Sequence, residues 1–376
     1  MTRRQPLIAT LLAIALLTAG CTTSRDPDVE GAGGAEPTTT VRFPAAPGLP
    51  DLPAQPDGVP FPTKAWATAS ANPKVAGEID GLLDQAFAGP DDPFGRVEAV
   101  VVVAGGRIVA ERYGRGHTAD ARHVSWSVAK SVTNALLGIL AGDGRLDMFS
   151  PAAVTEWADP TDPRHAITPD ALARMSSGLE WREVADAVAL VGSIDKGPAA
   201  AQQATRPLGG TVGGTFNYST GSTSINGRII GDLVGTGAEF TAWAHQVLFT
   251  PLGIEDVELL LDTSGYFAGG WGANMSARNF ARFGLLYLRD GRWDGLRVLP
   301  PGWVDFSRSP SATNASYGAG WWLDRYGPGT FAAEGFMGQK VVVDPRHDVV
   351  VVVLAGNFDS GPPGRLAAAL VSAFDN

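Results

Sequence analysis

The sequence predicts an α+β fold, in which both ends of the folded region build one antiparallel sheet and a mostly helical lobe lies between them. Strand-like runs flank short turns near residues 97–113 and again near residues 339–354. The segments between these two hairpins carry mainly the apolar spacing of helices. Because helices cover sheets in folds of this class, we expect the middle of the chain, about residues 145–270, to form the lobe.

Each predicted hairpin consists of two runs rich in β-branched residues around a turn. The first joins Val97–Val103 to Arg107–Tyr113 through a glycine pair. The second joins Gln339–Val343 to Val349–Leu354 through a longer turn that contains Pro345. These four strands are the expected centre of the sheet.

Helical spacing is clearest in four segments, Val128–Ala141, Pro169–Met175, Glu239–Leu248 and Ala277–Leu288. The region 205–235 is rich in Gly, Ser and Thr and ends in an apolar helical pattern. Loops of this kind on a rigid scaffold often carry function.

The N-terminus has the features of an export signal. Arg3 and Arg4 precede an apolar run at residues 7–17, and Thr18-Ala19-Gly20 leads to Cys21, the only cysteine. This ending resembles a bacterial lipoprotein signal, residues 1–21, in which Cys21 would be lipidated. The alternative is a plain secretory signal with an incidental cysteine. The first reading predicts an exported protein, lipid-anchored at the outer face of a bacterial cell membrane.

Residues 22–62 are rich in Pro, Gly, Thr and Asp, and we expect a flexible tether there. The folded domain is then expected at residues 63–376.

The composition excludes several functions. A net charge of −10, with no basic run after residue 4, argues against a nucleic-acid partner. No His-Glu-x-x-His, cysteine pair or Walker-type loop occurs, so we expect no metal and no cofactor. The sequence does not specify an oligomeric state.

The candidate chemistry begins at Ser127 and Lys130, a Ser-x-x-Lys at the start of an apolar helical segment. Residues three apart share a helix face, so the Lys130 amine can reach the Ser127 hydroxyl. Burial in that helix would lower the lysine pKa, and a neutral lysine could accept the serine proton. The chain has five lysines against 24 arginines, and only lysine can act as a base. The alternative is a capping serine with a lysine that extends to solvent.

A second Ser-x-x-Lys, Ser193 to Lys196, shows that the spacing alone is weak evidence. Gly197-Pro198 follows directly and prevents a long helix, and Asp195 would keep the lysine charged. We interpret this copy as a surface loop.

Seven segments, taken in order, resemble one family. They are GRIVAERYG, SWSVAKSV, LARMSSGLEW, FNYSTGSTSIN, PLGI, ARFGLLYL and GFMGQKVVVDP. Together they resemble the class C β-lactamase-like serine hydrolases, which share a penicillin-binding-protein-like fold, and especially the branch with carboxylesterases and 6-aminohexanoate-oligomer hydrolases. The resemblance covers about residues 65–376.

The resemblance implies a role for several residues. Ser127 would be the acylated nucleophile, Lys130 its base partner, and Tyr218 a second acid/base group with a pKa lowered by the neighbouring lysine. The backbone N–H groups of Ser127 and Phe336 would form the oxyanion hole. Thr220 and Gly335 would bind substrate.

Two departures from the family pattern affect the expected substrate. Thr220 stands where the tyrosine motif usually ends in asparagine, so it offers no amide to the substrate. Ala333-Glu334-Gly335 stands where many relatives have Lys-Thr-Gly or His-x-Gly. The missing cation at Ala333 removes a partner for a substrate carboxylate.

We therefore expect an exported serine hydrolase that cleaves a small neutral ester or amide. One alternative is a β-lactamase or D,D-peptidase that acts on cell-wall-type amides. Another is a non-catalytic surface lipoprotein that binds a ligand with the same fold.

Overall fold

The computed structural model describes residues 43–89 and 93–375. The predicted signal peptide, Cys21 and the first part of the predicted tether lie outside the described residues. In the described part, no helix combines the length and the apolar character that a membrane span needs.

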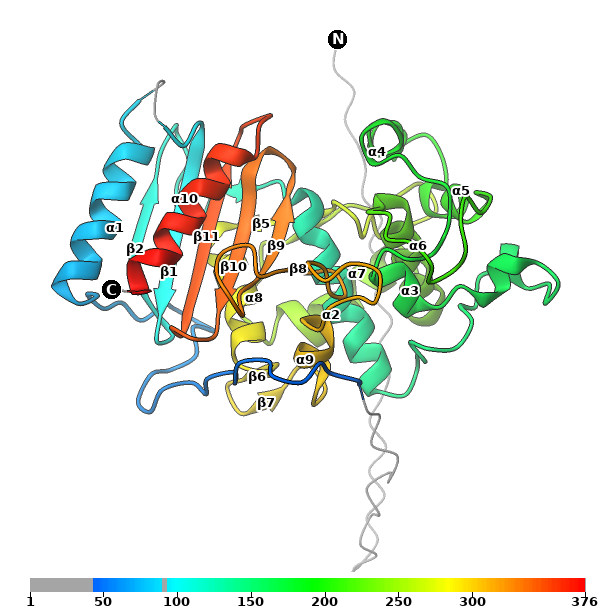
Figure 1. The fold of residues 1–376 in the computed structure, drawn as a ribbon, viewed down its shortest axis with the longest axis horizontal. Coiled ribbons are helices and arrows are strands. Elements are labelled where there is room, and N and C mark those ends of the chain that lie inside the picture. The colour runs from blue at the N-terminus through cyan, green and yellow to red at the C-terminus, as the bar shows by residue number, and fades with distance from the viewer. Residues whose placement is uncertain (1–42, 90–92, 376) are drawn as a thin grey trace, which may run out of the picture. The chain divides into compact units, whose positions relative to one another are not determined.

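Residues 43–62 pack against the domain, so the predicted tether is wrong for this stretch (Figure 1, dark blue). Phe43 is buried, and its ring centroid lies 4.9 Å from that of Trp303. Arg289 Nη1 donates to the Pro53 carbonyl at 3.2 Å, and Ala46 N–H donates to Ser309 Oγ at 2.7 Å. A Pro-rich segment has few partners within itself, and here side chains of the domain bind its backbone groups.

The predicted antiparallel sheet is confirmed, and it has six strands in the order β2-β1-β11-β10-β9-β8. The two predicted hairpins supply its first four strands. The last two extend it towards the helical lobe (Figure 1). The strands are β1 (Val97–Ala104), β2 (Arg107–Tyr113), β8 (Trp322–Leu323), β9 (Phe331–Gly335), β10 (Gln339–Asp344) and β11 (Val349–Ala355).

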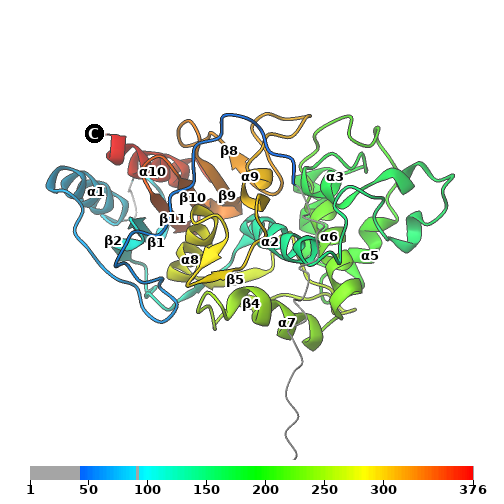
Figure 2. The ribbon, with the colours of Figure 1, turned by 90° about the horizontal axis from the view of Figure 1, so that it is seen from below.

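Helices cover both faces of this sheet, which explains the unbroken valine runs of β1 and β11. On one face lie α1 (Pro73–Ala86) and α10 (Gly361–Ser372), and on the other lies α8 (Ala277–Leu288). Figure 2 shows α10 and α8 on opposite sides of β10 and β11. A strand that is buried on both sides loses the alternation of polar and apolar residues.

Helices are the main regular elements of the segment between α2 (Ala129–Gly142) and α8, and this segment lies beside the sheet (Figure 1, green). Its α-helices are α3 (Pro169–Ala173), α4 (Glu183–Val191), α5 (Ala199–Ala204), α6 (Thr220–Val234) and α7 (Ala238–Ala244). The predicted helix Glu239–Leu248 is interrupted, because α7 continues as a π-helical turn at His245–Phe249.

Helix α2 lies at the junction between the sheet and the helical lobe (Figure 1). Every residue from Ala129 to Ala141 is buried, so the helix packs on all sides. A short sheet of β3 (Arg122–His123), β5 (Ala273–Ser276) and β4 (Glu258–Leu259) lies next to the start of α2. This arrangement places the turn before α2 where the two halves of the domain meet.

Candidate active site

Ser127 lies in a 3₁₀ turn, Trp126–Val128, that leads directly into α2. Trp126 has φ +45°, a left-handed conformation that costs free energy for a residue with a Cβ. The preceding Ser125 holds this turn in place, because its N–H donates to Asn274 Oδ1 at 3.0 Å and its hydroxyl donates to the Trp271 carbonyl at 2.8 Å. The nucleophile candidate therefore lies on a rigid, strained turn.

Lys130 is the central group of the site. Its side chain is buried, and Nζ donates to Ser127 Oγ at 2.8 Å, to Thr220 Oγ1 at 2.9 Å and to the Gly270 carbonyl at 3.1 Å. Burial lowers the pKa of Lys130 to about 8, while the charge of Glu183 acts in the opposite direction. About a tenth of the amine is therefore neutral at pH 7, beside the Ser127 hydroxyl.

Thr220 connects Lys130 to a carboxylate that sequence reasoning missed. The hydroxyl of Thr220 accepts from Lys130 and donates to Glu183 Oε1, and the Thr220 N–H donates to Glu183 Oε2 at 2.8 Å. Trp181 Nε1 also donates to the Glu183 carboxylate. Glu183 is in the first turn of α4, 37 residues before Thr220. No local pattern points to such a contact, because tertiary packing alone creates it.

This geometry changes the role that fits Thr220. The sequence predicts a direct contact with substrate, and Thr220 does line the pocket. Its hydroxyl, however, is buried and bonded on both sides. In this arrangement the Thr220 hydroxyl can position the Lys130 amine.

Tyr218 lies beside Lys130, with Lys130 Nζ 4.8 Å from the centroid of its ring. The ring stacks on Trp322, with centroids 5.3 Å apart, and packs edge-on against Tyr317. Burial raises the pKa of the Tyr218 phenol, and a hydrogen bond with the Ser127 side chain partly offsets the rise. The expectation of a lowered pKa is therefore wrong, because desolvation outweighs the Ser127 hydrogen bond and the Arg325 charge, and Tyr218 rests as a proton donor.

Gly335 allows the end of β9 to approach the nucleophile turn. A Cβ at this position would lie 2.5 Å from the Ser125 carbonyl oxygen and 3.1 Å from Trp126 Cβ. The next residue, Phe336, packs its ring edge-on against Trp126, with centroids 5.5 Å apart. The structure thus places both residues against the turn that carries Ser127, and the oxyanion hole of the Ser127 and Phe336 N–H groups stays a prediction.

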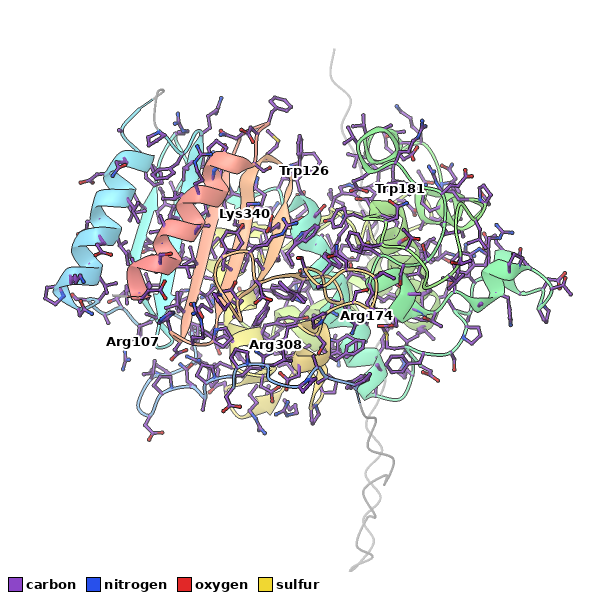
Figure 3. All side chains as sticks on the ribbon, viewed as in Figure 1. Arg107, Trp126, Arg174, Trp181, Arg308 and Lys340 are labelled. Carbon is purple, nitrogen blue, oxygen red and sulfur yellow. The ribbon has the colours of Figure 1, made fainter. Side chains whose placement is uncertain are left out.

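Ser127 opens into a pocket of about 570 Å³ between the sheet and the helical lobe. Apolar side chains form most of its wall, from Trp126, Trp271 and Trp322 around the nucleophile to Val184 and Val188 of α4. Figure 3 shows Trp126 and Lys340 on the sheet side and Trp181 on the helical side of this junction. Ser127, Tyr218, Thr220, Gly335 and Phe336 all line this pocket.

Ala333 is buried in the core, and its methyl side chain supplies no cation to the pocket. Two other cations line the pocket instead, Lys340 of β10 and Arg325. Both form ion pairs with Glu334, at 2.7 Å and 3.2 Å. The sequence predicts a strand in this part of β10 but gives Lys340 no role in the site.

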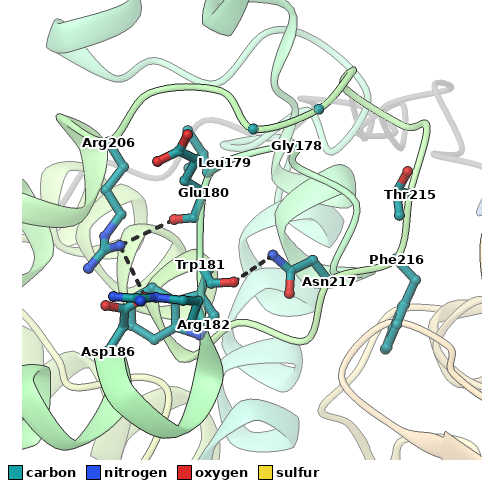
Figure 4. A pocket seen from close by; sticks show the side chains of 12 residues that line it. Gly178, Leu179, Glu180, Trp181, Arg182, Asp186, Arg206, Thr215, Phe216 and Asn217 are labelled. Carbon is teal, nitrogen blue, oxygen red and sulfur yellow. Dashed lines mark hydrogen bonds and ion pairs between the residues drawn. The ribbon is translucent and has the colours of Figure 1, made fainter.

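A second pocket, of about 690 Å³, lies on the helical lobe (Figure 4). Arg206 lies above the Trp181 ring and forms an ion pair with Asp186, and Asn217 Nδ2 donates to the Trp181 carbonyl at 3.0 Å. Neither Ser127 nor Lys130 lines it. We therefore place the chemistry in the Ser127 pocket.

Among the described residues, one group of side chains could be considered for a metal: Glu98, His117 and His123. The two imidazole rings are stacked, with centroids 4.6 Å apart and planes at 22°. Lone pairs in nearly parallel ring planes do not converge on one ion. His123 hydrogen-bonds to the Glu98 carboxylate at 3.2 Å, and His117 lies 3.5 Å from the same oxygen, so side-chain contacts alone account for the cluster.

Comparison with known proteins gives consistent matches. The sequence model of the family described as Beta-lactamase matches residues 95–374. A 6-aminohexanoate-dimer hydrolase of Paenarthrobacter ureafaciens is 27% identical over 286 residues, which cover 69% of this chain and 72% of that protein.

Solved structures share the fold. A candidate 6-aminohexanoate-dimer hydrolase from Bacillus anthracis superposes with a TM-score of 0.68 at 23% identity, covering 86% of this chain and 89% of that one. A family VIII carboxylesterase superposes with a TM-score of 0.63 at 15% identity, covering 81% and 99%.

Proposed function

Because the chain belongs to the Beta-lactamase family and is a serine hydrolase of that superfamily, we propose that it cleaves an uncharged ester or amide through an acyl-enzyme on Ser127. One observation carries the proposal: the buried Lys130 amine lies 2.8 Å from Ser127 Oγ, and its pKa is lowered to about 8. A positioned base next to a hydroxyl on a strained turn is the arrangement that nucleophilic catalysis requires.

Acylation begins when neutral Lys130 accepts the Ser127 proton and Oγ attacks the substrate carbonyl carbon. The carbonyl oxygen becomes an oxyanion, which the N–H groups of Ser127 and Phe336 stabilise. The carbon–leaving-group bond then breaks, and the Tyr218 phenol donates its proton to the leaving group. The Lys130 ammonium returns a proton to Tyr218. The raised pKa of Tyr218 supports this order of events, because the phenol begins protonated.

Deacylation repeats the sequence with water. Neutral Lys130 accepts a proton from the water while the water oxygen attacks the acyl carbon. The second tetrahedral intermediate collapses, the bond to Ser127 Oγ breaks, and the Tyr218 phenol donates a proton to Oγ. The Lys130 ammonium then returns a proton to Tyr218. The carboxylic acid product then leaves.

The lining of the pocket favours a neutral substrate. Its wall is largely apolar, and its cations, Lys340 and Arg325, are both paired with Glu334. The same cations are the observation that favours the second candidate, a β-lactamase or D,D-peptidase, since a substrate carboxylate could compete for them. The relative that is named a 6-aminohexanoate-dimer hydrolase supports the inclusion of amides in the proposal.

The test compares the purified domain with Ser127→Ala. Both proteins are incubated with an activated short-chain ester, a chromogenic β-lactam and a serine-reactive fluorophosphonate. We expect ester turnover that the variant lowers by at least about 10⁴-fold, with fluorophosphonate labelling of Ser127. Preferred β-lactam turnover supports the second candidate. A folded protein that is not labelled at Ser127 is a non-catalytic binding module, and both enzyme proposals fail.

The proposal extends to location. The segment that ends at Cys21 supports export and lipid anchoring at the outer face of a bacterial cell membrane. Cys21→Ala is then expected to move the full chain from the membrane fraction to the soluble exported fraction. A protein that sediments with membranes equally well with and without Cys21 contradicts the anchor.

A further inference from the structure

Three charged side chains line the part of the Ser127 pocket formed by the sheet. Glu334 and Lys340 lie directly opposite each other on β9 and β10, and Lys340 Nζ is 2.7 Å from Glu334 Oε2. Arg325 approaches the same carboxylate oxygen at 3.2 Å. The Lys340 and Glu334 side chains are only 5% and 11% exposed, so solvent screens this pair weakly, whereas the Arg325 side chain is 40% exposed.

The charged group is connected to the catalytic residues. The Arg325 guanidinium lies 3.5 Å above the Trp322 ring, and Trp322 stacks on Tyr218. The charges of Glu334 and Arg325 also act on the pKa of Tyr218, in opposite directions. A charged substrate group in this part of the pocket would therefore interact electrostatically with all three side chains.

The formal charges that line the pocket cancel. Glu183 is the remaining carboxylate there, and Trp181 and Thr220 already bond to it. The two carboxylates, Glu183 and Glu334, equal the two cations in number, and both cations pair with Glu334. Around them the surface is apolar, and Val184, Val188 and Phe336 remain exposed at 83%, 72% and 47%. Exposed apolar side chains around a pocket mark a binding surface.

We propose that Glu334 determines specificity: by pairing with Lys340 and Arg325 it excludes charged substrate groups, and the enzyme takes esters or amides with an uncharged, apolar acyl chain. An anionic group would compete with Glu334 for its two partners. A cationic group would compete with Lys340 and Arg325 for the Glu334 carboxylate. An apolar chain disturbs neither pair and covers the valines of α4. This inference rests on the proposed hydrolase function.

The test uses p-nitrophenyl esters of three acyl chains of equal length, with a methyl, a carboxylate or an ammonium group at the far end. Wild type is expected to prefer the methyl chain over both charged chains in kcat/KM. Glu334→Gln frees the two cations, so the ratio of carboxylate-chain to methyl-chain kcat/KM should rise at least about tenfold. Lys340→Met leaves excess negative charge, so the ratio of ammonium-chain to methyl-chain kcat/KM should rise instead.

Two controls separate specificity from general damage. Glu255→Gln removes one exposed charge that does not line the pocket, and both ratios should stay within about twofold of wild type. The double variant Glu334→Gln/Lys340→Met removes both partners, and its carboxylate-to-methyl ratio should fall below that of Glu334→Gln. Circular dichroism establishes that each variant folds, and either single variant alone suffices for the test.

The proposal is overturned if a folded Glu334→Gln or Lys340→Met keeps its charged-to-methyl ratio within about twofold of wild type. It is also overturned if wild type prefers a charged chain. Failure of the proposed function looks different: wild type then hydrolyses none of the three esters, or Ser127→Ala hydrolyses them equally well.

Discussion

The chain contains the same four-residue spacing twice, at Ser127 to Lys130 and at Ser193 to Lys196, and the two segments have opposite surroundings. Lys130 is buried at the start of α2, and its amine donates to Ser127. Lys196 is exposed in the loop after α4, where the Ser193 hydroxyl donates instead to the Leu190 carbonyl at 3.0 Å. Water therefore solvates Lys196, whereas Lys130 is removed from water by the protein interior.

The difference shows what makes a lysine a base. Spacing brings an amine within reach of a hydroxyl, but only burial lowers the lysine pKa enough to leave a neutral fraction. Burial depends on the long apolar helix that contains Lys130, whereas Gly197-Pro198 separates Lys196 from the short helix α5. The following predictions, ordered from the largest expected effect to the smallest, test this contrast.

Replacing the buried lysine by a permanent cation should abolish most activity. Lys130→Arg keeps a positive charge beside Ser127, but a guanidinium does not deprotonate, so kcat should fall by about 10³-fold or more. The measurement is ester hydrolysis in parallel with Lys196→Arg, which should match wild type. Comparable activity in the two variants contradicts the assignment of the base.

The activity of wild type should depend on pH through Lys130. The neutral amine is the active form, so kcat/KM should rise as pH rises through the lysine pKa, which is about 8, and level off above it. Below that pH it should fall about tenfold per unit. A pH profile with an uncharged ester measures this rise, and a rate independent of pH between 6 and 9 contradicts it.

Much of this contrast, and most of the sheet, can be predicted from the sequence because the signals are local. The hairpins at residues 97–113 and 339–354 follow from β-branched runs around turns, and the structure confirms them. The proximity of Ser127 and Lys130 follows from helical periodicity. Helices α1 and α10 were missed, since glycines and prolines interrupt their apolar patterns.

The remaining site residues meet through tertiary packing and leave no local signal. Glu183 reaches Thr220 from another helix, and Lys340 meets Glu334 because two strands pair in one register. The direction of the Tyr218 pKa depends on how deeply the fold buries the ring, which spacing does not reveal. The segment at residues 43–62 was misjudged because arginines far along the chain bind its carbonyl groups.

Burial of Lys130 should also have a cost in stability. Its pKa is lowered from 10.5 to about 8, which corresponds to about 3 kcal/mol against the charged folded state at neutral pH. The unfolded state binds more protons between pH 8 and 10.5, so this contribution to stability improves as pH rises through that range. Lys130→Met removes the charge but leaves the Gly270 carbonyl without its donor, which costs about 1–2 kcal/mol.

The net result at pH 7 should be a variant that is inactive yet about 1–2 kcal/mol more stable than wild type. Urea denaturation at pH 7 measures the free energy of unfolding. The gain should be smaller at pH 10, where the wild-type lysine is neutral in the folded state. A variant that is less stable than wild type at both pH values contradicts the claim that burial of the charged Lys130 amine destabilises the folded state.

Glu183 should change the pKa of the base, Lys130, without acting as a base itself. Its charge raises the pKa of Lys130, and Gln can still accept the N–H of Thr220. Glu183→Gln should therefore move the midpoint of the pH profile to lower pH, with kcat above that midpoint reduced by less than about tenfold. Glu255→Gln, which removes an exposed charge elsewhere, should leave the midpoint in place. A midpoint that stays the same in Glu183→Gln assigns the Glu183–Thr220 contact to structure alone.

The smallest effect is expected at Ser193 and Lys196, where the Ser-x-x-Lys spacing recurs with an exposed lysine. The double variant Ser193→Ala/Lys196→Met removes one hydroxyl, bonded only to a nearby carbonyl among the described contacts, and one exposed amine. Its kcat, its pH midpoint and its fluorophosphonate labelling should match those of wild type, and its free energy of unfolding should change by less than about 0.5 kcal/mol. The matched variant Ser127→Ala/Lys130→Met makes the same two substitutions and should lose all turnover. A loss of activity in both double variants would mean that the loop after α4 contributes to catalysis, and burial alone would no longer distinguish the two segments.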